Sequence, residues 1–192
     1  MIFVQHPLAV FAAAVVSGLT PLAQTAYASV ASGLAPRTVC QGQAAVSAPV
    51  GVQVRAMRCL INWARDHNGR YGLRDQSQLD RSASLRAGDI RRCQDFSHTA
   101  CGRPFTLVFT IVGYLTGTAS VGENLAFGQG RLGSARAAMA GWLASPGHRQ
   151  ILFDPRWRDL GLSLVKARSL FGRSNVSVWV AQFGYRGSPV LP

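Results

Sequence analysis

The chain has almost no glutamate and almost no lysine. Glu123 is the only glutamate among eight acidic residues, and Lys166 is the only lysine among twenty basic residues. The formal net charge of +12 is therefore carried by arginine, and it favours anionic partners such as a cell-wall polymer or a lipid headgroup. The alternative is a basic surface that serves only solubility. The sequence has no Lys/Arg run beyond Arg91-Arg92 and no RNA-binding aromatic motif, which argues against a dedicated nucleic-acid partner.

Motifs of common hydrolases are also missing. The sequence contains no HExxH helix of a zinc protease and no GxSxG elbow of a serine hydrolase. It contains four cysteines, and none stands in the CxxC spacing of a metal site. An even number of cysteines in an exported protein points to two disulfides. Three pairings can form from four cysteines. We favour Cys40–Cys59 and Cys93–Cys101, with four reduced thiols or a metal site as the alternatives.

No apolar run is long enough to span a bilayer as a helix. The run from Leu8 to Leu19 is short, and Ala26-Tyr27-Ala28 after it has the small-x-small pattern of a cleavage site. We expect residues 1–28 to be a signal peptide. Because no Lys or Arg precedes the run, a non-cleaved segment is the alternative. The protein is expected to be secreted, extracellular or associated with the cell wall, with no transmembrane span after signal removal.

The remaining sequence indicates one domain with short extensions. Residues 29–49 are rich in Ala, Ser, Gly, Pro and Gln, which indicates a flexible N-terminal arm, either a linker or a pinned segment. The domain is expected over residues 50–187, and residues 188–192 form a tail. We find no internal repeat.

Helical periodicity dominates the first part of this domain. Residues 52–67 place Met57, Leu60, Ile61 and Ala64 on one face, and residues 78–93 carry an apolar stripe of Leu79, Ala83, Ala87 and Ile90. A third helix is expected over 135–143 with Ser134 as its N-cap. A short helix then starts at Pro146, with Ser145 able to cap it.

The period changes to two near the C-terminus. Apolar residues alternate over 160–165 and again over 176–181, on either side of a Gly/Ser/Asn-bearing connection at 167–175. This pattern predicts an antiparallel hairpin. Helices first and strands later, with a mixed middle, indicate an α+β fold with helices packed on an antiparallel sheet.

Three residues are the candidates for site chemistry: His98, Glu123 and His148. The sequence predicts that Glu123 lies in a tight, Gly-flanked Val-Gly-Glu-Asn turn. Two imidazoles and one carboxylate form a plausible zinc-ligand set with a fourth position open for water or substrate. The alternative is that His98 caps a loop, His148 caps a helix, and Glu123 pairs with one of the nineteen arginines.

Five stretches in order carry a resemblance to a known family. They are CLINWARDHNGRYGL, FSHTACG, GENLAFG, GWLASPGHRQIL and WVAQFG, and they extend from Cys59 to Gly184. Together they resemble the CAP superfamily of cysteine-rich secretory proteins, antigen 5 and pathogenesis-related proteins, in its bacterial exported (SCP-like) branch. Each motif alone is modest, and the order of five makes the resemblance specific.

The resemblance implies a three-layer α-β-α sandwich with a central antiparallel sheet, and a cleft formed by two histidines and two acids. Matched by motif, the histidines are His98 and His148 and the first acid is Glu123. Ser145 stands where the second acid would be, so the set of four is reduced to three. Ser97 and Asn124 adjoin the cleft, and Asn124 could bond the neighbouring loop.

Three functions are compatible with these residues. The first is a noncatalytic extracellular module that binds a divalent metal, Zn²⁺ above all, and a lipid or glycan ligand. The second is a zinc-dependent hydrolase acting on a cell-wall or protein substrate. The third is a structural protein whose arginines adhere to an anionic wall polymer. Trp63, Phe96, Phe105, Phe127 and Trp142 could line a ligand groove, although core packing is the more common use of such residues.

Overall fold

The computed structural model describes residues 33–187. The predicted signal peptide and the predicted tail lie outside the described residues. The helices and strands, in chain order, are α2 (Val50–Asp66), β1 (Arg74–Asp75), α3 (Ser77–Cys93), η1 (Ala100–Gly102), α4 (Leu107–Ile111), β2 (Ala119–Gln129), η2 (Gly130–Gly133), α5 (Ala135–Ala144), α6 (Pro146–Leu152), β3 (Asp159–Leu170) and β4 (Arg173–Arg186).

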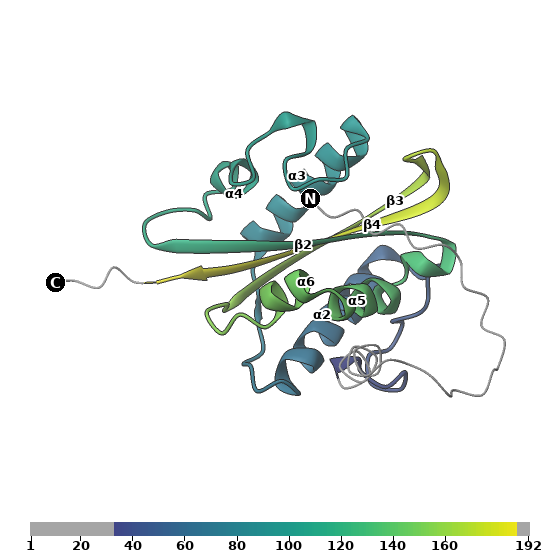
Figure 1. Cartoon of the computed structure of the whole chain (residues 1–192), viewed down its shortest axis with the longest axis horizontal. Coiled ribbons are helices and arrows are strands. Elements are labelled where there is room, and N and C mark those ends of the chain that lie inside the picture. Colours follow the sequence, from purple (N-terminus) through teal and green to yellow (C-terminus); the bar gives the residue numbers. More distant parts are fainter. Residues whose placement is uncertain (1–32, 188–192) are drawn as a thin grey trace.

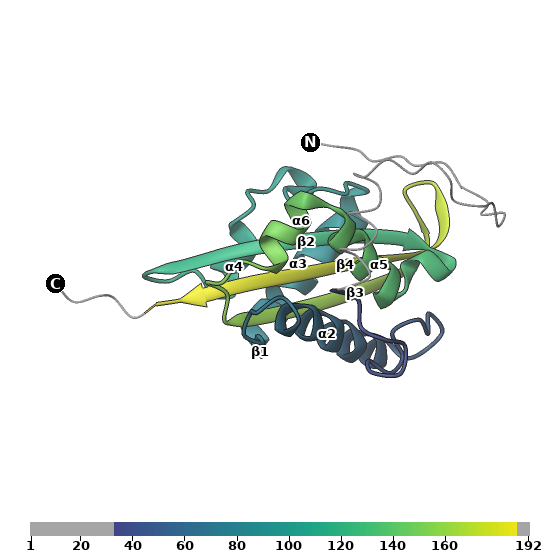
Figure 2. The same ribbon diagram turned by 60° about the horizontal axis from the view of Figure 1, so that its bottom comes forward.

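The sheet lies between two layers of helices (Figures 1 and 2). Its strand order is β1-β3-β4-β2, and the three long strands pair antiparallel. Helices α3 and α4 cover one face, and α2, α5 and α6 cover the other (Figure 1). The expected α-β-α sandwich is therefore confirmed. The sheet departs from the expected antiparallel arrangement only at β1, which pairs parallel with β3 over two residues.

Side chains that alternate along β4 pack against the helices on both faces of the sheet. Because successive side chains of a strand point to opposite faces, the valines of β4 pack towards α3 while the alternate residues pack towards α2 and α5. The first set is Val176, Val178 and Val180, and the second is Trp179, Ala181 and Phe183. The predicted period of two is confirmed over this strand.

The hairpin between β3 and β4 is tighter than the sequence predicts. The expected connection, residues 167–175, pairs as exposed strand up to Leu170 opposite Arg173. The loop consists of Phe171 and Gly172 alone, which have positive φ angles of 54° and 67°. Two successive left-handed residues match the twist of a two-residue hairpin loop. The polar residues that suggested a long connection lie instead on exposed strand ends.

The helix caps follow the sequence in part. Ser134 caps α5, because its side chain accepts a hydrogen bond from the backbone N of Ala137 at 3.2 Å. Pro146 occupies the start of α6, as predicted. Ser145 stands at the N-cap position of α6, but its hydroxyl makes no capping hydrogen bond. The capping role predicted for Ser145 is therefore wrong.

The described part of the N-terminal arm, residues 33–49, is pinned to the domain. Cys40 is bonded to Cys59 in α2, and Ala35 and Cys40 belong to the buried core. Arg136 Nη1 donates to the carbonyl of Ala35 at 2.7 Å, and Lys166 Nζ donates to that of Val46 at 2.6 Å. The second disulfide joins Cys93 and Cys101, so the favoured pairing is confirmed. Over residues 33–187, no helix is long and apolar enough to cross a membrane.

Gly161 fixes how closely α3 can approach β3. A Cβ atom there would overlap the backbone carbon of Leu79 and the backbone N of Asp80. We expect Gly161→Ala to lower the free energy of unfolding by about 1–3 kcal/mol, because the helix must shift. Gly141→Ala is the matched control, since no described atom lies within 4 Å of its Cβ. Equal urea midpoints for the two variants would contradict this packing.

Candidate functional site

Glu123 lies in the middle of a strand and not in a turn. It belongs to β2, which runs without a break from Ala119 to Gln129, so the predicted turn is wrong. Gly122, the residue before Glu123, serves the packing of the strand and not a turn. A Cβ atom at Gly122 would lie 2.9 Å from Cζ2 of Trp157 and 3.3 Å from Cγ2 of Ile151. Glycine is therefore required here so that the segment after α6 can pack on the strand.

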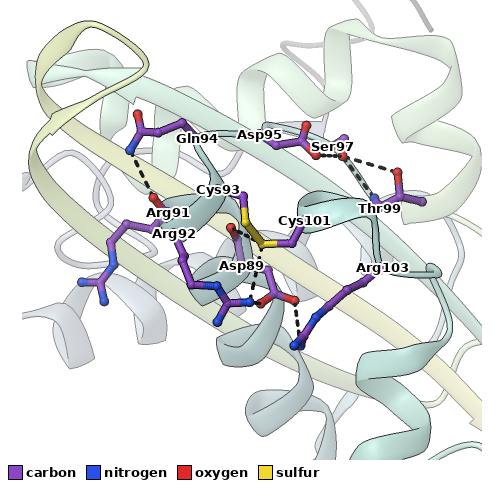
Figure 3. Close-up of a disulfide and its surroundings, with 10 residues drawn as sticks. All are labelled: Asp89, Arg91, Arg92, Cys93, Gln94, Asp95, Ser97, Thr99, Cys101 and Arg103. Atoms are coloured by element: carbon purple, nitrogen blue, oxygen red, sulfur yellow. Dashed lines mark hydrogen bonds and ion pairs between the residues drawn. A yellow bond between two sulfur atoms is a disulfide. The ribbon is translucent and has the colours of Figure 1, made fainter.

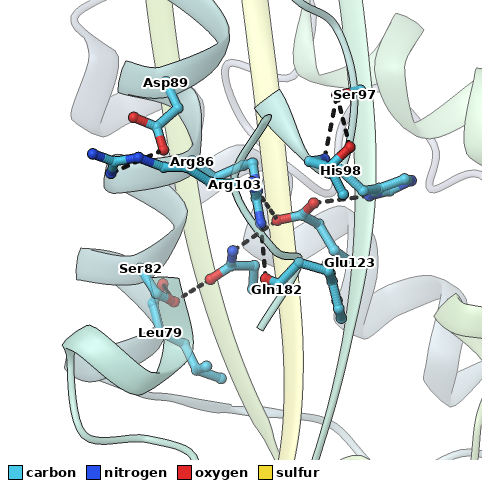
Figure 4. A network of polar contacts seen from close by, with 11 residues as sticks. Leu79, Ser82, Arg86, Asp89, Ser97, His98, Arg103, Glu123 and Gln182 are labelled. Carbon is cyan, nitrogen blue, oxygen red and sulfur yellow. Dashed lines mark hydrogen bonds and ion pairs between the residues drawn. The ribbon is translucent and has the colours of Figure 1, made fainter. Parts of the chain in front are cut away.

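The carboxylate of Glu123 is buried and bound on both oxygens (Figure 4). Oε1 accepts a hydrogen bond from His98 Nδ1 at 2.8 Å, and Oε2 accepts one from Gln182 Nε2 at 2.7 Å. Because a carboxylate can only accept, the Nδ1 atom of His98 is assigned the proton. Nε of Arg86 lies 3.4 Å from Oε2. The network extends to Ser82, whose hydroxyl donates to Oε1 of Gln182.

Strand register and helix periodicity bring this network together. Glu123 and Gln182 are directly opposite on β2 and β4, and both side chains point towards α3. Ser82 and Arg86 lie one helical turn apart on the buried face of α3, beside Ala83 and Ala87. The network is therefore a polar patch within the interface between α3 and the sheet.

Arg86 supplies the positive charge that faces the Glu123 carboxylate in this network. Its side chain is completely buried, as is that of Glu123. Nη2 donates to the carbonyl of Phe105 at 2.8 Å, whereas Nε and Nη1 have no hydrogen-bond partner among the described residues. A buried charge without a counter-charge is strongly destabilising. The alternative that Glu123 pairs with an arginine is thus confirmed, and the same carboxylate also binds His98.

The loop that carries His98 is held at both ends. The Cys93–Cys101 disulfide closes it (Figure 3). Within the loop, Ser97 Oγ donates to Asp95 Oδ2 at 3.0 Å and accepts from the backbone N of Thr99 at 3.2 Å. Ser97, predicted to adjoin the cleft, therefore shapes the loop. The side chain of His98 is 51% exposed, so the ring is anchored on its Nδ1 side and open to solvent elsewhere.

Asp89 ties the same loop to the end of α3. Its carboxylate accepts a hydrogen bond from Arg92 Nη2 at 2.6 Å, and Arg103 Nη1 lies 3.5 Å from its other oxygen (Figure 3). The contact with Arg92 lies within α3, and the contact with Arg103 ties the chain after the loop to this buried acid. This support keeps the position of His98 relative to Glu123 well defined.

His148 approaches from the opposite layer. Asn124, the residue after Glu123, points to the other face of β2, and its Nδ2 donates to the carbonyl of His148 in α6 at 3.1 Å. The sequence predicts a bond from Asn124 to the neighbouring loop, whereas its partner lies in helix α6. Burial lowers the pKa of His148, and the nearby His98 lowers it further. His148 Nδ1 is buried with no hydrogen-bond partner among the described residues.

The other residues that the sequence predicts for the site mostly take part in packing contacts. Ser145 is half-buried at the start of α6. Trp142 belongs to the core, and its Nε1 donates to the carbonyl of Leu125 at 2.9 Å. Trp63 stacks on His67, with ring centroids 3.9 Å apart. Phe105 lies edge-on to His98 at a centroid distance of 6.2 Å, which makes it the aromatic neighbour of the site.

The described residues leave few donor groups free for a divalent metal. Over residues 33–187, no group of three or more His, Cys, Asp or Glu side chains has the spacing of a metal site. Both oxygens of Glu123 are engaged. His98 keeps Nε2 free of Glu123, and His148 has an unpartnered ring nitrogen. Any metal at this site would therefore have to be held by the two imidazoles, with Glu123 behind His98 as the carboxylate that orients it.

The sequence alone did not identify Ser82, Arg86 and Gln182 as site residues. Each of them is nevertheless a polar residue that interrupts an apolar period. Gln182 continues the inward series of Val176, Val178 and Val180 and is the first polar residue in it. Ser82 and Arg86 lie on the apolar stripe of α3. A polar side chain on a buried face needs a polar partner, so these interruptions mark the network.

Comparisons with known proteins agree with this architecture. No family model matches the chain. YkwD of Bacillus subtilis is 27% identical over 154 residues, which is 78% of this chain and 54% of YkwD. The chain thus spans about half the length of the curated relative that it matches.

Three solved structures are similar to the fold. An extracellular SCP-domain protein of Bacillus anthracis is 21% identical with a TM-score of 0.57, over 71% of this chain and 41% of that one. An outer surface protein of Borrelia burgdorferi is 19% identical with a TM-score of 0.60, over 70% and 93%. A cysteine-rich secretory protein of Staphylococcus aureus is 15% identical with a TM-score of 0.52, over 71% and 40%. The resemblance to the CAP superfamily is confirmed at the level of the fold.

The Arg86–Glu123 pair can be tested by a double-mutant cycle. Glu123→Gln leaves Arg86 buried without its counter-charge, so we expect a loss of about 3–5 kcal/mol in the free energy of unfolding. Arg86→Met should also destabilise the protein. The double variant removes both charges and should cost clearly less than the sum of the two single changes. Urea unfolding of all four proteins measures the coupling.

Arg156→Met is the control for this cycle, because Arg156 pairs with Asp154 on the surface with 63% of its side chain exposed. Its loss should change stability little. Strictly additive effects of Glu123→Gln and Arg86→Met would show that the buried pair is not coupled.

Proposed function

We propose that this protein is a noncatalytic extracellular module that binds a divalent cation, with zinc the best candidate, at His98 and His148. The observation that carries the proposal is the hydrogen bond from His98 Nδ1 to the buried carboxylate of Glu123. Histidines that bind metals usually donate their other ring nitrogen to such a group, which fixes the ring and strengthens the ligand. Nε2 of His98 is then the nitrogen available to the cation.

The state of His148 supports the same proposal. A metal binds neutral imidazole, so a proton competes with it. Burial and the neighbouring His98 lower the pKa of His148, which keeps its ring neutral at a pH where an ordinary histidine is partly protonated. When bound, the cation would be held by the two neutral imidazoles and would offer its open positions to a ligand.

The extracellular location is supported by three observations. Two of the structural neighbours are described as an extracellular protein and an outer surface protein. Two disulfides suit an oxidising compartment, and residues 1–28 are predicted to be a signal peptide. The net charge of +12 favours an anionic ligand or surface there, such as a lipid, an acidic glycan or a cell-wall polymer.

The alternative of a zinc-dependent hydrolase is less well supported. A metal-bound water is a nucleophile near neutral pH, but its deprotonation and the leaving group need an acid or base within reach. Glu123 is engaged on both oxygens by His98 and Gln182. Ser145 replaces the second acid of the family pattern. Binding without hydrolysis is therefore the function that these residues favour.

Zinc titration by calorimetry tests the proposal on oxidised residues 29–192. We expect one-to-one binding that is lost in His98→Ala and in His148→Ala. Glu123→Gln combined with Arg86→Met, which removes both buried charges, should weaken binding by about 10–100-fold without abolishing it, because Glu123 orients a ligand. His67→Ala is the control, since this histidine stacks on Trp63.

Two results would count against the proposal. The first is the absence of zinc binding in the intact protein. The second is full affinity in His148→Ala. Complete loss of binding in the double variant, with its fold intact, would instead make Glu123 a direct ligand, as the sequence alone suggests.

A further inference from the structure

Three phenylalanines from three segments meet at one end of the sheet. Phe96 follows α3, Phe127 lies near the end of β2, and Phe171 forms the β3–β4 turn. Their ring centroids are 4.8 Å (96–127), 5.2 Å (127–171) and 6.0 Å (96–171) apart, all edge to face. Phe127 is nevertheless 40% exposed, and Leu132 in the adjoining η2 is 65% exposed. The cluster is thus only partly used for packing.

One member of this cluster, Phe171, has an unfavourable backbone conformation. Phe171 has a φ of 54°, a left-handed value that asparagine or glycine adopts far more readily than a bulky side chain. Its backbone N donates to Oε1 of Gln94 at 2.8 Å, and Gln94 is itself left-handed with a φ of 53°. The contacts at the end of α3 therefore fix an aromatic residue at a turn where a small polar one would fit with less strain.

Four exposed arginines lie in the segments that form or adjoin this end of the sheet. Arg173 pairs with Leu170 across the turn, and Arg168 precedes it on β3. Arg131 is next to Leu132 in η2, which directly follows β2, and Nε2 of Gln129 at the end of β2 donates to Ser174 Oγ of the hairpin at 3.0 Å. Arg91 accepts a hydrogen bond on its carbonyl from Gln94. Among residues 33–187, none of these four arginines takes part in an ion pair.

We propose that this surface, the aromatic tip, docks on an anionic lipid bilayer. The aromatic tip consists of Phe96, Phe127, Phe171 and Leu132 with Arg91, Arg131, Arg168 and Arg173. Exposed apolar side chains enter the boundary between headgroups and acyl chains, and the arginines bind lipid phosphates. A soluble anionic polymer would use the arginines but would leave Phe127 and Leu132 in water. The proposal rests on the extracellular location proposed above and not on the metal.

Vesicle co-sedimentation of residues 29–192 tests this surface. We expect binding to vesicles of phosphatidylglycerol and phosphatidylcholine, and little binding to phosphatidylcholine alone. Phe127→Ser and Leu132→Ser should each weaken binding at least several-fold, and Leu132→Ser is the cleaner change because most of that side chain is in solvent. Arg168→Gln with Arg173→Gln should weaken binding and reduce its dependence on salt.

Matched controls use the same residue types on other elements. Ile111→Ser replaces an apolar side chain that is 55% exposed in α4, and Arg55→Gln replaces an exposed arginine in α2. Both should bind vesicles as the intact protein does. His98→Ala should also bind normally, which separates this surface from the metal proposal.

Three outcomes would overturn the proposal. They are no binding to anionic vesicles, equal loss in Ile111→Ser and Leu132→Ser, and unchanged binding in both apolar tip variants. The last outcome, together with competition by soluble polyphosphate, would assign the arginines to an anionic polymer.

Discussion

The carboxylate of Glu123 is buried between α3 and the sheet, and a carboxylate in that position must be hydrogen-bonded and counter-charged to be tolerated. Arg86 supplies the charge, and Gln182 supplies one hydrogen bond. The remaining oxygen is left for His98. The scarcity of glutamate therefore has a structural counterpart: the single glutamate is the centre of the buried network that connects the helical layer, the sheet and an exposed imidazole.

The edge strand β2 links the two surfaces for which we propose functions. Glu123 and Asn124 point to opposite faces, so one residue holds the His98 loop and the next holds the His148 helix. Phe127 follows Glu123 by four residues and lies on the same face, about 13 Å further along the strand. A metal-binding cleft and a lipid-binding tip would thus be placed by one element, and each could be altered without disturbing the other.

Local patterns predicted much of the fold but little of the network. The long helices and the β3–β4 pairing followed from periodicity, and the disulfide pairing that we favoured among three is the one observed. Strand β2 was missed because residues 122–125 are buried on both faces, so no alternation marks them, and Gly-Glu-Asn is typical of a turn. The arginine that pairs with Glu123 could not be predicted from the sequence either. Nineteen arginines are alike in sequence, and only the packing of α3 on the sheet selects Arg86.

The most direct test of the central claim is the protonation site of the His98 ring in the metal-free protein. Long-range ¹H–¹⁵N NMR distinguishes the two neutral tautomers. If the buried carboxylate orients His98, the neutral ring carries its proton on Nδ1 and leaves Nε2 unprotonated. A neutral ring protonated mainly on Nε2, or a mixture of both tautomers like that of a free histidine, would contradict the role assigned to Glu123.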